Sequence, residues 1–349
     1  MTPDCRSFLF TCAAALFCAA PAAAHEAWLL TPQEVYQLSL APVPALFLDR
    51  RALVLVAVAS ALAVFAALLL AERFQPPAAE RVFARLRAAS LDFGPLALRL
   101  GLGFTIGLNA LGGLPRHGTG RWSEPALFVP DMQLSLAPGW EWLAPCAVIA
   151  AALLLSGLAV RAAALGVIML ALLGACAFPT DFLLYYAPHF AAPALLLLHY
   201  GGGRLSLDAL FAAPEQVHGG AASDAVWTTA QVLAGFGFAL IAVCVKFLQP
   251  TLLIAILDHG ALSFFGLPQP WAALIMMSIE LLAGVLLAMG LLLRPVALFL
   301  IGAFTFFAIV LKESPLLHGN LYGLCLFLVL HGGRSPGRRR NRLRQAERA

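Results

Sequence analysis

One acidic residue, Glu280, stands near the middle of an apolar segment that runs from Trp271 to Leu293. An ionised carboxylate at that depth in a bilayer costs roughly 2.5 kcal/mol or more, so it must be neutral, paired or directed into a polar cavity. A carboxylic acid there can exchange the proton that moves when a quinone changes its redox state. The alternative is a buried acid that is hydrogen-bonded to a neighbouring helix, with Lys246 and Asn109 as candidate partners. We also count both partners as candidate quinone-binding residues.

Histidines form the second group of candidate functional residues. Five are expected on or near the outer face of the membrane: His25, His117, His189, His259 and His318. Imidazole is the commonest ligand of transition metals in proteins, so His25, His189 and His318 are candidate metal ligands. At His25 a free α-amine and the imidazole could chelate one copper ion together. His189 and His318 are also expected to line the outer entrance of a quinone site. No HxH or HExxH spacing joins any two histidines, so the alternative is that they only cap helix starts at the interface.

The composition excludes a water-soluble protein. Hydrophobic residues make up 61% of the 349 residues and charged residues 11%, with a mean hydropathy of +0.88, against roughly 25% charged residues in soluble domains. Continuous apolar runs in a bilayer must satisfy their backbone hydrogen bonds internally and favour helices over barrel strands. The net charge of +4 arises from basic residues beside apolar segments and in the C-terminal tail, which indicates contact with lipid headgroups rather than with nucleic acid.

Nine apolar segments are long enough to cross or nearly cross a membrane, judged against about 20 residues per span. They are 52–70, 96–111, 142–160, 162–178, 183–200, 226–247, 271–293, 296–311 and 316–330. The sequence therefore predicts an all-α polytopic membrane protein with about nine transmembrane helices. Between the first two segments, 76–90 carries arginines at helical spacing, which predicts either an amphipathic helix on the inner surface or a solvated linker.

The start of the chain predicts the orientation. Residues 1–24 have the features of a signal peptide, with Arg6 before an apolar stretch and alanines 22–24 at a cleavage site, so that His25 becomes the N-terminus. With that end outside, most arginines fall on the inner side, including the tail after Arg334, as the positive-inside rule requires. We expect a multi-pass protein of a bacterial inner membrane, with its C-terminus in the cytoplasm.

An internal repeat divides the membrane region. The stretch SGLAVR at 156–161 resembles MGLLLR at 289–294, LGLGFTIGL loosely matches AGFGFALIA, and the halves end in LLLLHYGGGR and LFLVLHGGR. His189 and His318 each stand at the outer start of the last helix of a half. Each unit has four spans, an even number, so the sequence predicts parallel repeats about an axis along the membrane normal, with the first span outside them. The predicted boundaries are 1–24 signal peptide, 25–51 external segment, 52–90 first span and linker, 91–212 first repeat, 213–225 linker, 226–333 second repeat and 334–349 basic tail.

The repeat resembles the DoxX/DoxD-like family of four-helix inner-membrane proteins, which includes the small subunit of thiosulfate:quinone oxidoreductase. The resemblance covers roughly 96–210 and 226–333, and it is strongest in Glu280-x3-Gly284-x5-Gly290-x3-Arg294 and in GGGRLSLD, which ends at Asp208. The first copy departs from the pattern, since it carries Ala147 where the second has Glu280, so a function that needs the acid belongs to the second copy alone.

The resemblance implies the membrane part of a redox system that passes electrons from a small external donor to quinone, with a second redox subunit or periplasmic partner. Two alternatives stay open: a passage for a small solute or metal ion between the two units, and a scaffold that docks a periplasmic partner through the external loop 112–139. The chain has no P-loop and no CxxCH haem motif, which argues against ATP-driven transport and covalent haem. The four cysteines beyond residue 24 form no CxxC pair, which argues against a thiol–disulfide relay.

Overall fold

The computed structural model describes residues 30, 32–73, 77–112, 115–116, 120–121, 124–179, 182, 186–211, 224–260, 262, 266–311 and 314–332. The predicted signal peptide, His25, His117, most of the linker 213–225 and the basic tail lie outside the described residues. The described part is an all-α polytopic membrane protein, to which strands β1 (Pro115–Arg116) and β2 (Gly120–Arg121) add one small antiparallel pair.

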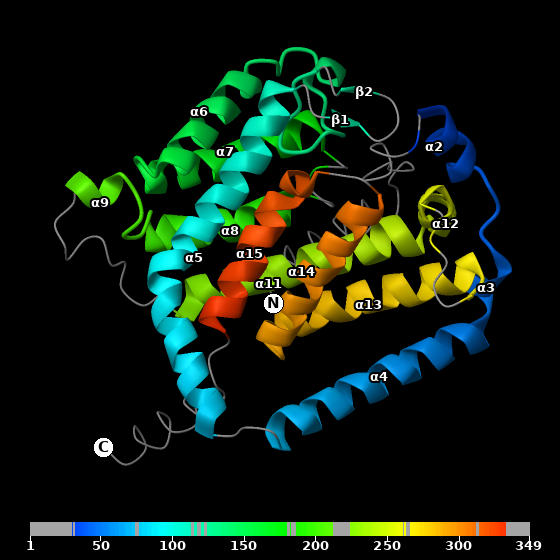
Figure 1. Ribbon diagram of the computed structural model, residues 1–349. Coiled ribbons are helices and arrows are strands. Elements are labelled where there is room, and N and C mark those ends of the chain that lie inside the picture. Colours follow the sequence, from blue (N-terminus) through cyan, green and yellow to red (C-terminus); the bar gives the residue numbers. More distant parts are fainter. Residues whose placement is uncertain are drawn as a thin grey trace, which may run out of the picture.

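All nine predicted spans overlap helices (Figure 1). The first unit contains α5 (Pro77–Leu111), α6 (Leu143–Ser156), α7 (Val160–Ala177) and α8 (Ala187–Tyr200). The second contains α11 (Asp224–Leu240) with its continuation η4 (Ile241–Phe247), α13 (Gln269–Met289), α14 (Leu293–Val310), and η5 (Pro315–His318) with α15 (Gly319–His331). The other helices are α2 (Pro32–Ser39), α3 (Ala45–Leu48), α4 (Arg50–Arg73), η2 (Leu134–Leu136), α9 (Asp208–Phe211) and α12 (Pro250–His259).

Six of the described helices are long and apolar enough to cross a membrane, while α6, α12 and η5 with α15 are shorter apolar helices. Two features differ from the sequence prediction. The expected surface helix and the second span form one continuous helix, α5, so the predicted boundary at residue 90 lies inside it. Helix α12 was not expected, and it lies between the two spans that carry Lys246 and Glu280.

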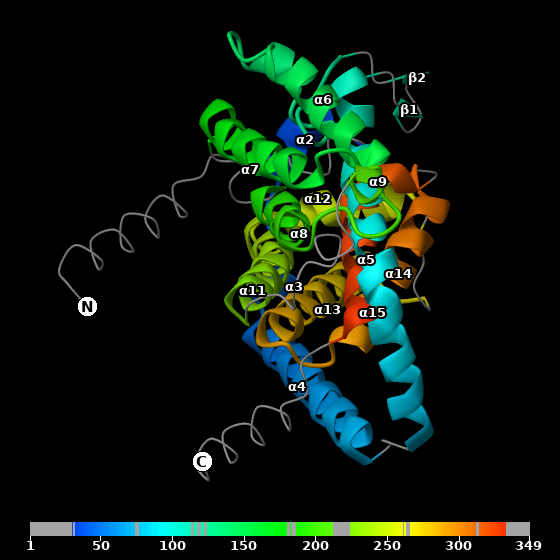
Figure 2. The same cartoon turned by 90° about the vertical axis from the view of Figure 1, so that its left-hand side faces the viewer.

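The two units contact each other reciprocally. Within each unit, the first helix packs on the second and the third on the fourth, and between the units α5 packs on α15 while α11 packs on α8. The first helix of each unit therefore lies against the last helix of the other. Helices α5 and α15 run side by side in Figure 1 and Figure 2, and α4, which packs on α13, lies at the opposite end of the molecule from α6.

The repeated sequence stretches share a backbone conformation. Gly157 ends α6 with φ +72° and Gly290 ends α13 with φ +73°, values that glycine adopts without steric cost. Two residues later, Ala159 and Leu292 have φ +49° and +51°. These paired turns have the same geometry, as expected for a duplicated unit.

The arginines after these turns make matching hydrogen bonds. Arg161 Nη2 donates to the carbonyl oxygen of His199 at 3.4 Å, and Arg294 Nη2 donates to that of Leu330 at 3.2 Å. Carbonyl groups at a helix C-terminus have no partner within the helix, so a nearby guanidinium satisfies them. Each unit thus attaches the end of its fourth helix to the start of its third.

The same equivalence shows that His189 and His318, although each stands near the start of the last helix of its unit, are not at equivalent positions. Gly201 and Gly332 end α8 and α15 with φ +71° and +69°. Counted back from these glycines, His189 corresponds to Asn320, and His318 lies two residues earlier. The asparagine side chain reaches across to the other unit, where its Nδ2 donates to the carbonyl oxygen of His189 at 3.4 Å.

Candidate functional site

The second unit contains a cavity of about 770 Å³. Helices α13 and α14 form most of its wall, the α11–η4 segment and α12 add further side chains, and α8, η5 and α15 contribute one lining residue each. The cavity brings together four residues that the sequence singled out: His189, Lys246, Glu280 and His318. Most of the remaining wall consists of aliphatic and phenylalanine side chains.

Glu280 and Lys246 form an ion pair across the cavity wall. The Nζ of Lys246 on η4 donates to Oε2 of Glu280 on α13, and the side chains are 21% and 19% exposed. Pairing reduces the cost of holding the carboxylate inside an apolar span. Of the two candidate partners for Glu280, the structure therefore selects Lys246.

The helical segment that carries Lys246 has π geometry. In η4 the turns are wider than in an α-helix, and the N–H group of Leu248 reaches the carbonyl oxygen of Val243 at 3.2 Å. The π segment ends at Phe247, and Gln249 is not helical because the following Pro250 disfavours helical geometry at the residue before it. Short π segments occur frequently at functional sites, where the wider turn changes the direction of a side chain.

Asn109, the other predicted partner, takes no part in the site. Its Nδ2 donates to the carbonyl oxygens of Thr105 at 2.8 Å and Phe128 at 2.9 Å. It is buried in the first unit and does not line the cavity. Asn109 thus holds the loop before α6 in place and lies outside this cavity.

His189 is the most deeply buried polar group of the cavity. The residue is 3% exposed, and its ring lies edge-on to Phe238, with ring centroids 4.8 Å apart. The backbone of Gly237 interacts with the ring, yet neither ring nitrogen attains hydrogen-bond geometry with a described residue. Buried polar atoms usually have a partner, so the imidazole can bond to a polar atom of a ligand in the cavity.

His318 lies at the junction of η5 and α15. Its ring stacks on Phe304 with centroids 5.9 Å apart, and Phe304 stacks on Phe238 at 6.0 Å. A chain of ring contacts thus connects the two histidines through two phenylalanines. Neither phenylalanine was predicted from the sequence, although the run GAFTFF after Ile301 places Phe304 with two further phenylalanines beside a glycine in one span.

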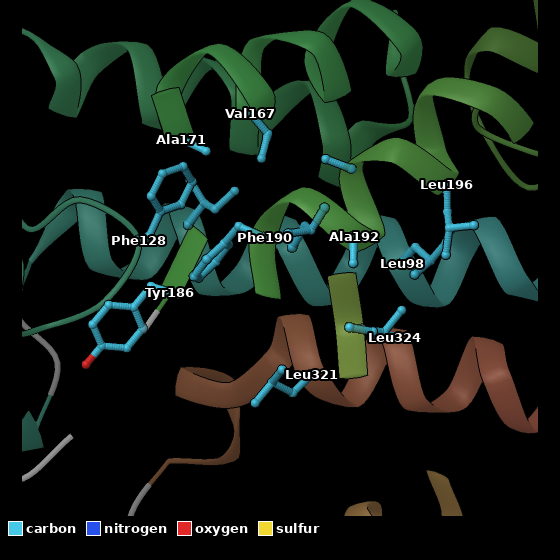
Figure 3. Packing of buried hydrophobic residues seen from close by; sticks show 14 of the residues in the cluster. Leu98, Phe128, Val167, Ala171, Tyr186, Phe190, Ala192, Leu196, Leu321 and Leu324 are labelled. Atoms are coloured by element: carbon cyan, nitrogen blue, oxygen red, sulfur yellow. The ribbon is translucent and has the colours of Figure 1, made fainter. Parts of the chain in front are cut away.

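The corresponding region of the first unit is filled by its own chain. Ala147 is fully buried at the place equivalent to Glu280. Residues 126–134 of the loop before α6 fold inward, so that Phe128 packs on Phe190 (Figure 3), with ring centroids 4.5 Å apart. Phe128 also stacks on Phe182 at 5.4 Å. The described part of this loop is therefore part of the hydrophobic core. The cavity lined by the Lys246–Glu280 pair lies in the second unit.

The described residues do not support the proposed copper site. They contain no group of three or more His, Cys, Asp or Glu side chains arranged to hold a metal ion. His189 and His318 both line the cavity, whereas His259 ends α12 and is exposed. The suggested role of His25 falls outside the residues that the structure describes.

Comparison with known proteins identifies no relative of this chain. The chain matches no protein-family model, no curated protein and no solved structure. The DoxX/DoxD-like resemblance remains a prediction from the sequence, and the cavity carries the functional argument.

Proposed function

We propose that this protein is a DoxX/DoxD-like component of a redox system in a bacterial inner membrane, and that its second unit binds quinone in the cavity. The observation that carries the proposal is the meeting of His189, His318 and the Lys246–Glu280 pair inside one largely apolar cavity. Small-molecule sites typically occupy about 300 to 1,000 Å³, with apolar walls and a few polar groups that fix orientation.

A quinone matches the distribution of groups on this wall. It has a flat ring with two carbonyl oxygens, and its chain is apolar. Phe238 and Phe304 are part of the apolar wall, and an N–H group of His189 can donate to a carbonyl oxygen. Because reduction to the quinol takes two electrons and two protons, an acid and a base in the site can assist it. Glu280 and Lys246 are placed to exchange those protons.

The electron donor follows from the family resemblance. Two thiosulfate ions release two electrons when they form tetrathionate, and these electrons with two protons convert one quinone into its quinol. We place the donor outside the membrane, on a second subunit or a periplasmic partner, with the mature N-terminus outside and the C-terminus in the cytoplasm. The arginine-rich tail after Arg334 and the apolar stretch that follows Arg6 support this orientation.

Passage of a solute through the membrane is the second candidate function. The observation that favours it is a charged pair on the wall of a cavity within apolar helices, a position where ionisable residues often mark a transport path. This candidate predicts uptake of a small solute into proteoliposomes without any electron transfer. It also predicts no saturable binding of quinone.

The experiment is a quinone titration of the purified protein, followed by thiosulfate-dependent quinone reduction with partner extract added. Wild type is compared with His189→Phe, with Glu280→Gln and with the matched control Asp92→Asn, a partly buried carboxylate that pairs with Arg204 away from the cavity. We expect binding to weaken at least about tenfold in both cavity variants, since each loses a polar contact of roughly 1.5 kcal/mol or more. Equal binding in all four folded proteins would refute the proposal.

A further inference from the structure

Four apolar side chains line the cavity and are also exposed on the surface of the molecule. They are Leu267, just before α13, with 40% exposure, Ile279 on α13 with 40%, and Phe299 and Phe306 on α14 with 51% and 44%. A side chain that borders both the cavity and the surface marks a place where the cavity opens. The opening therefore lies between α13 and α14.

Gly302 leaves space in this opening. It lines the cavity three residues after Phe299 and four before Phe306, so the three share one face of α14. A Cβ atom at Gly302 would meet nothing within 4 Å, and its φ is not in the left-handed region. A larger side chain can thus occupy the opening without strain in the backbone.

The surface around the opening is suited to lipid. Both α13 and α14 are long and apolar enough to cross a membrane, and the exposed residues at the opening are aliphatic or aromatic. In a bilayer such a surface meets acyl chains rather than water. The opening therefore admits molecules that are dissolved in the bilayer.

We infer that the quinone enters sideways from the bilayer between α13 and α14, and that its apolar chain stays in this opening while its ring lies toward His189 and the Lys246–Glu280 pair. The inference rests on the proposed function and adds the class of substrate: a quinone with a hydrocarbon chain, taken from the lipid phase. The polar groups recognise the ring, and the walls around Gly302 hold the chain.

The test compares two quinones with the same ring, one without a chain and one with a ten-carbon chain. Both are titrated into nanodiscs that contain wild type, Gly302→Phe or the control Gly166→Phe. Gly166 lies on α7 of the first unit, where a Cβ atom also meets nothing within 4 Å, and it does not line the cavity.

We expect Gly302→Phe to weaken binding of the long-chain quinone at least about tenfold, the loss that corresponds to roughly two buried methylene groups. Binding of the chainless quinone should stay within about twofold, and Gly166→Phe should change neither. Unchanged binding of the long-chain quinone to Gly302→Phe would overturn the inference, and so would an equal loss for both quinones.

A second measurement separates failure of this inference from failure of the proposed function. If neither quinone binds wild type, the proposed function fails, but the opening can still be probed with a phospholipid that carries a photoreactive group on its acyl chain. Leu300 and Ala308 line the cavity and are 4% and 5% exposed, so we expect lipid adducts on them in wild type and far fewer in Gly302→Phe. Absence of adducts there would show that the cavity is closed to the bilayer.

Discussion

The imidazole of His189 lies where a Cβ atom of Gly237 would be crowded, so that one unit supplies the histidine and the other supplies the space for it. A Cβ atom at Gly237 would stand 2.8 Å from Cε1 and 2.9 Å from Nε2 of the ring. At the other contact between the units, Thr105 on α5 accepts a hydrogen bond from the backbone N–H of Asn320 at 3.0 Å. Of these two contacts, the one at His189 borders the cavity.

Gly237→Ala should therefore weaken quinone binding more than it lowers stability. The added methyl group displaces the ring of His189 from its place beside Phe238. We expect a loss of affinity of about tenfold, the equivalent of one polar contact, measured by quinone titration together with thermal unfolding. A variant that binds as wild type would show that the position of the His189 ring is not needed.

Gly235→Ala serves as the contrast to that variant. A Cβ atom at Gly235 would overlap backbone atoms of Gly284 and Ala288, where α11 and α13 approach closely. Backbone cannot yield as a side chain can, so this change should lower the unfolding temperature clearly. If instead Gly237→Ala were the less stable of the two, the close approach of α11 and α13 would not be a main support of the second unit.

The effects of Lys246 and Glu280 on the free energy of unfolding should be coupled, because the two side chains form an ion pair. Lys246→Met or Glu280→Gln leaves one buried polar group without its partner, at a cost of roughly 1 to 3 kcal/mol. The double variant Lys246→Met with Glu280→Gln should recover part of that loss, because neither side chain remains charged. The measurement is a double-mutant cycle of denaturant unfolding in detergent, and additive losses in the cycle would mean that the two side chains do not interact.

The glycine turns of the repeat should resist substitution. Gly290→Ala would force a residue with a Cβ atom into the left-handed conformation, which destabilises the fold by about 1 to 2 kcal/mol. The Cβ atom would also stand 2.8 Å from Nε2 of Gln231. Gly166→Ala, in the open middle of α7, should instead stabilise its helix by about 0.5 to 1 kcal/mol. Thermal unfolding of the two variants should thus shift in opposite directions, and shifts of the same sign would contradict this interpretation of the turn.

The packing of Phe128 should hold the first unit closed. Its φ is +66° and its side chain is fully buried, so ring packing stabilises a backbone conformation that non-glycine residues rarely adopt. Phe128→Ala removes the ring and should cost about 3 to 5 kcal/mol. Unfolding measurements would detect this loss, and a value near zero would show that the loop before α6 is not part of the core.

The sequence predicted most of the helices because long apolar runs in a bilayer have few alternatives to a helix. The internal repeat was predictable because both turns contain a glycine. Gly157 and Gly290 adopt positive φ, a conformation that favours glycine, so the two turns share a sequence pattern. The two-residue shift between His189 and His318 was not visible, since both stand near a helix start and only the C-terminal glycines fix the register.

The site was partly predictable. A lone carboxylate in an apolar span identified Glu280, and the need to neutralise it limited the partners to a few groups, among them Lys246. The sequence could not choose between Lys246 and Asn109, because that choice depends on the π geometry of η4 and on the inward fold of the loop at Phe128. Nor could it show that buried Ala147 stands where the second unit has Glu280 on a cavity wall, because both units consist mainly of apolar spans.

The most direct test of the central claim is photolabelling of the protein in nanodiscs with a quinone that carries an azide on its ring. We predict adducts on the cavity wall, in the peptides that contain Phe238, Phe304 or His318, and their loss when unlabelled quinone is present in excess. Adducts confined to other lipid-facing helices, or adducts that excess quinone does not diminish, would contradict a quinone site in the second unit.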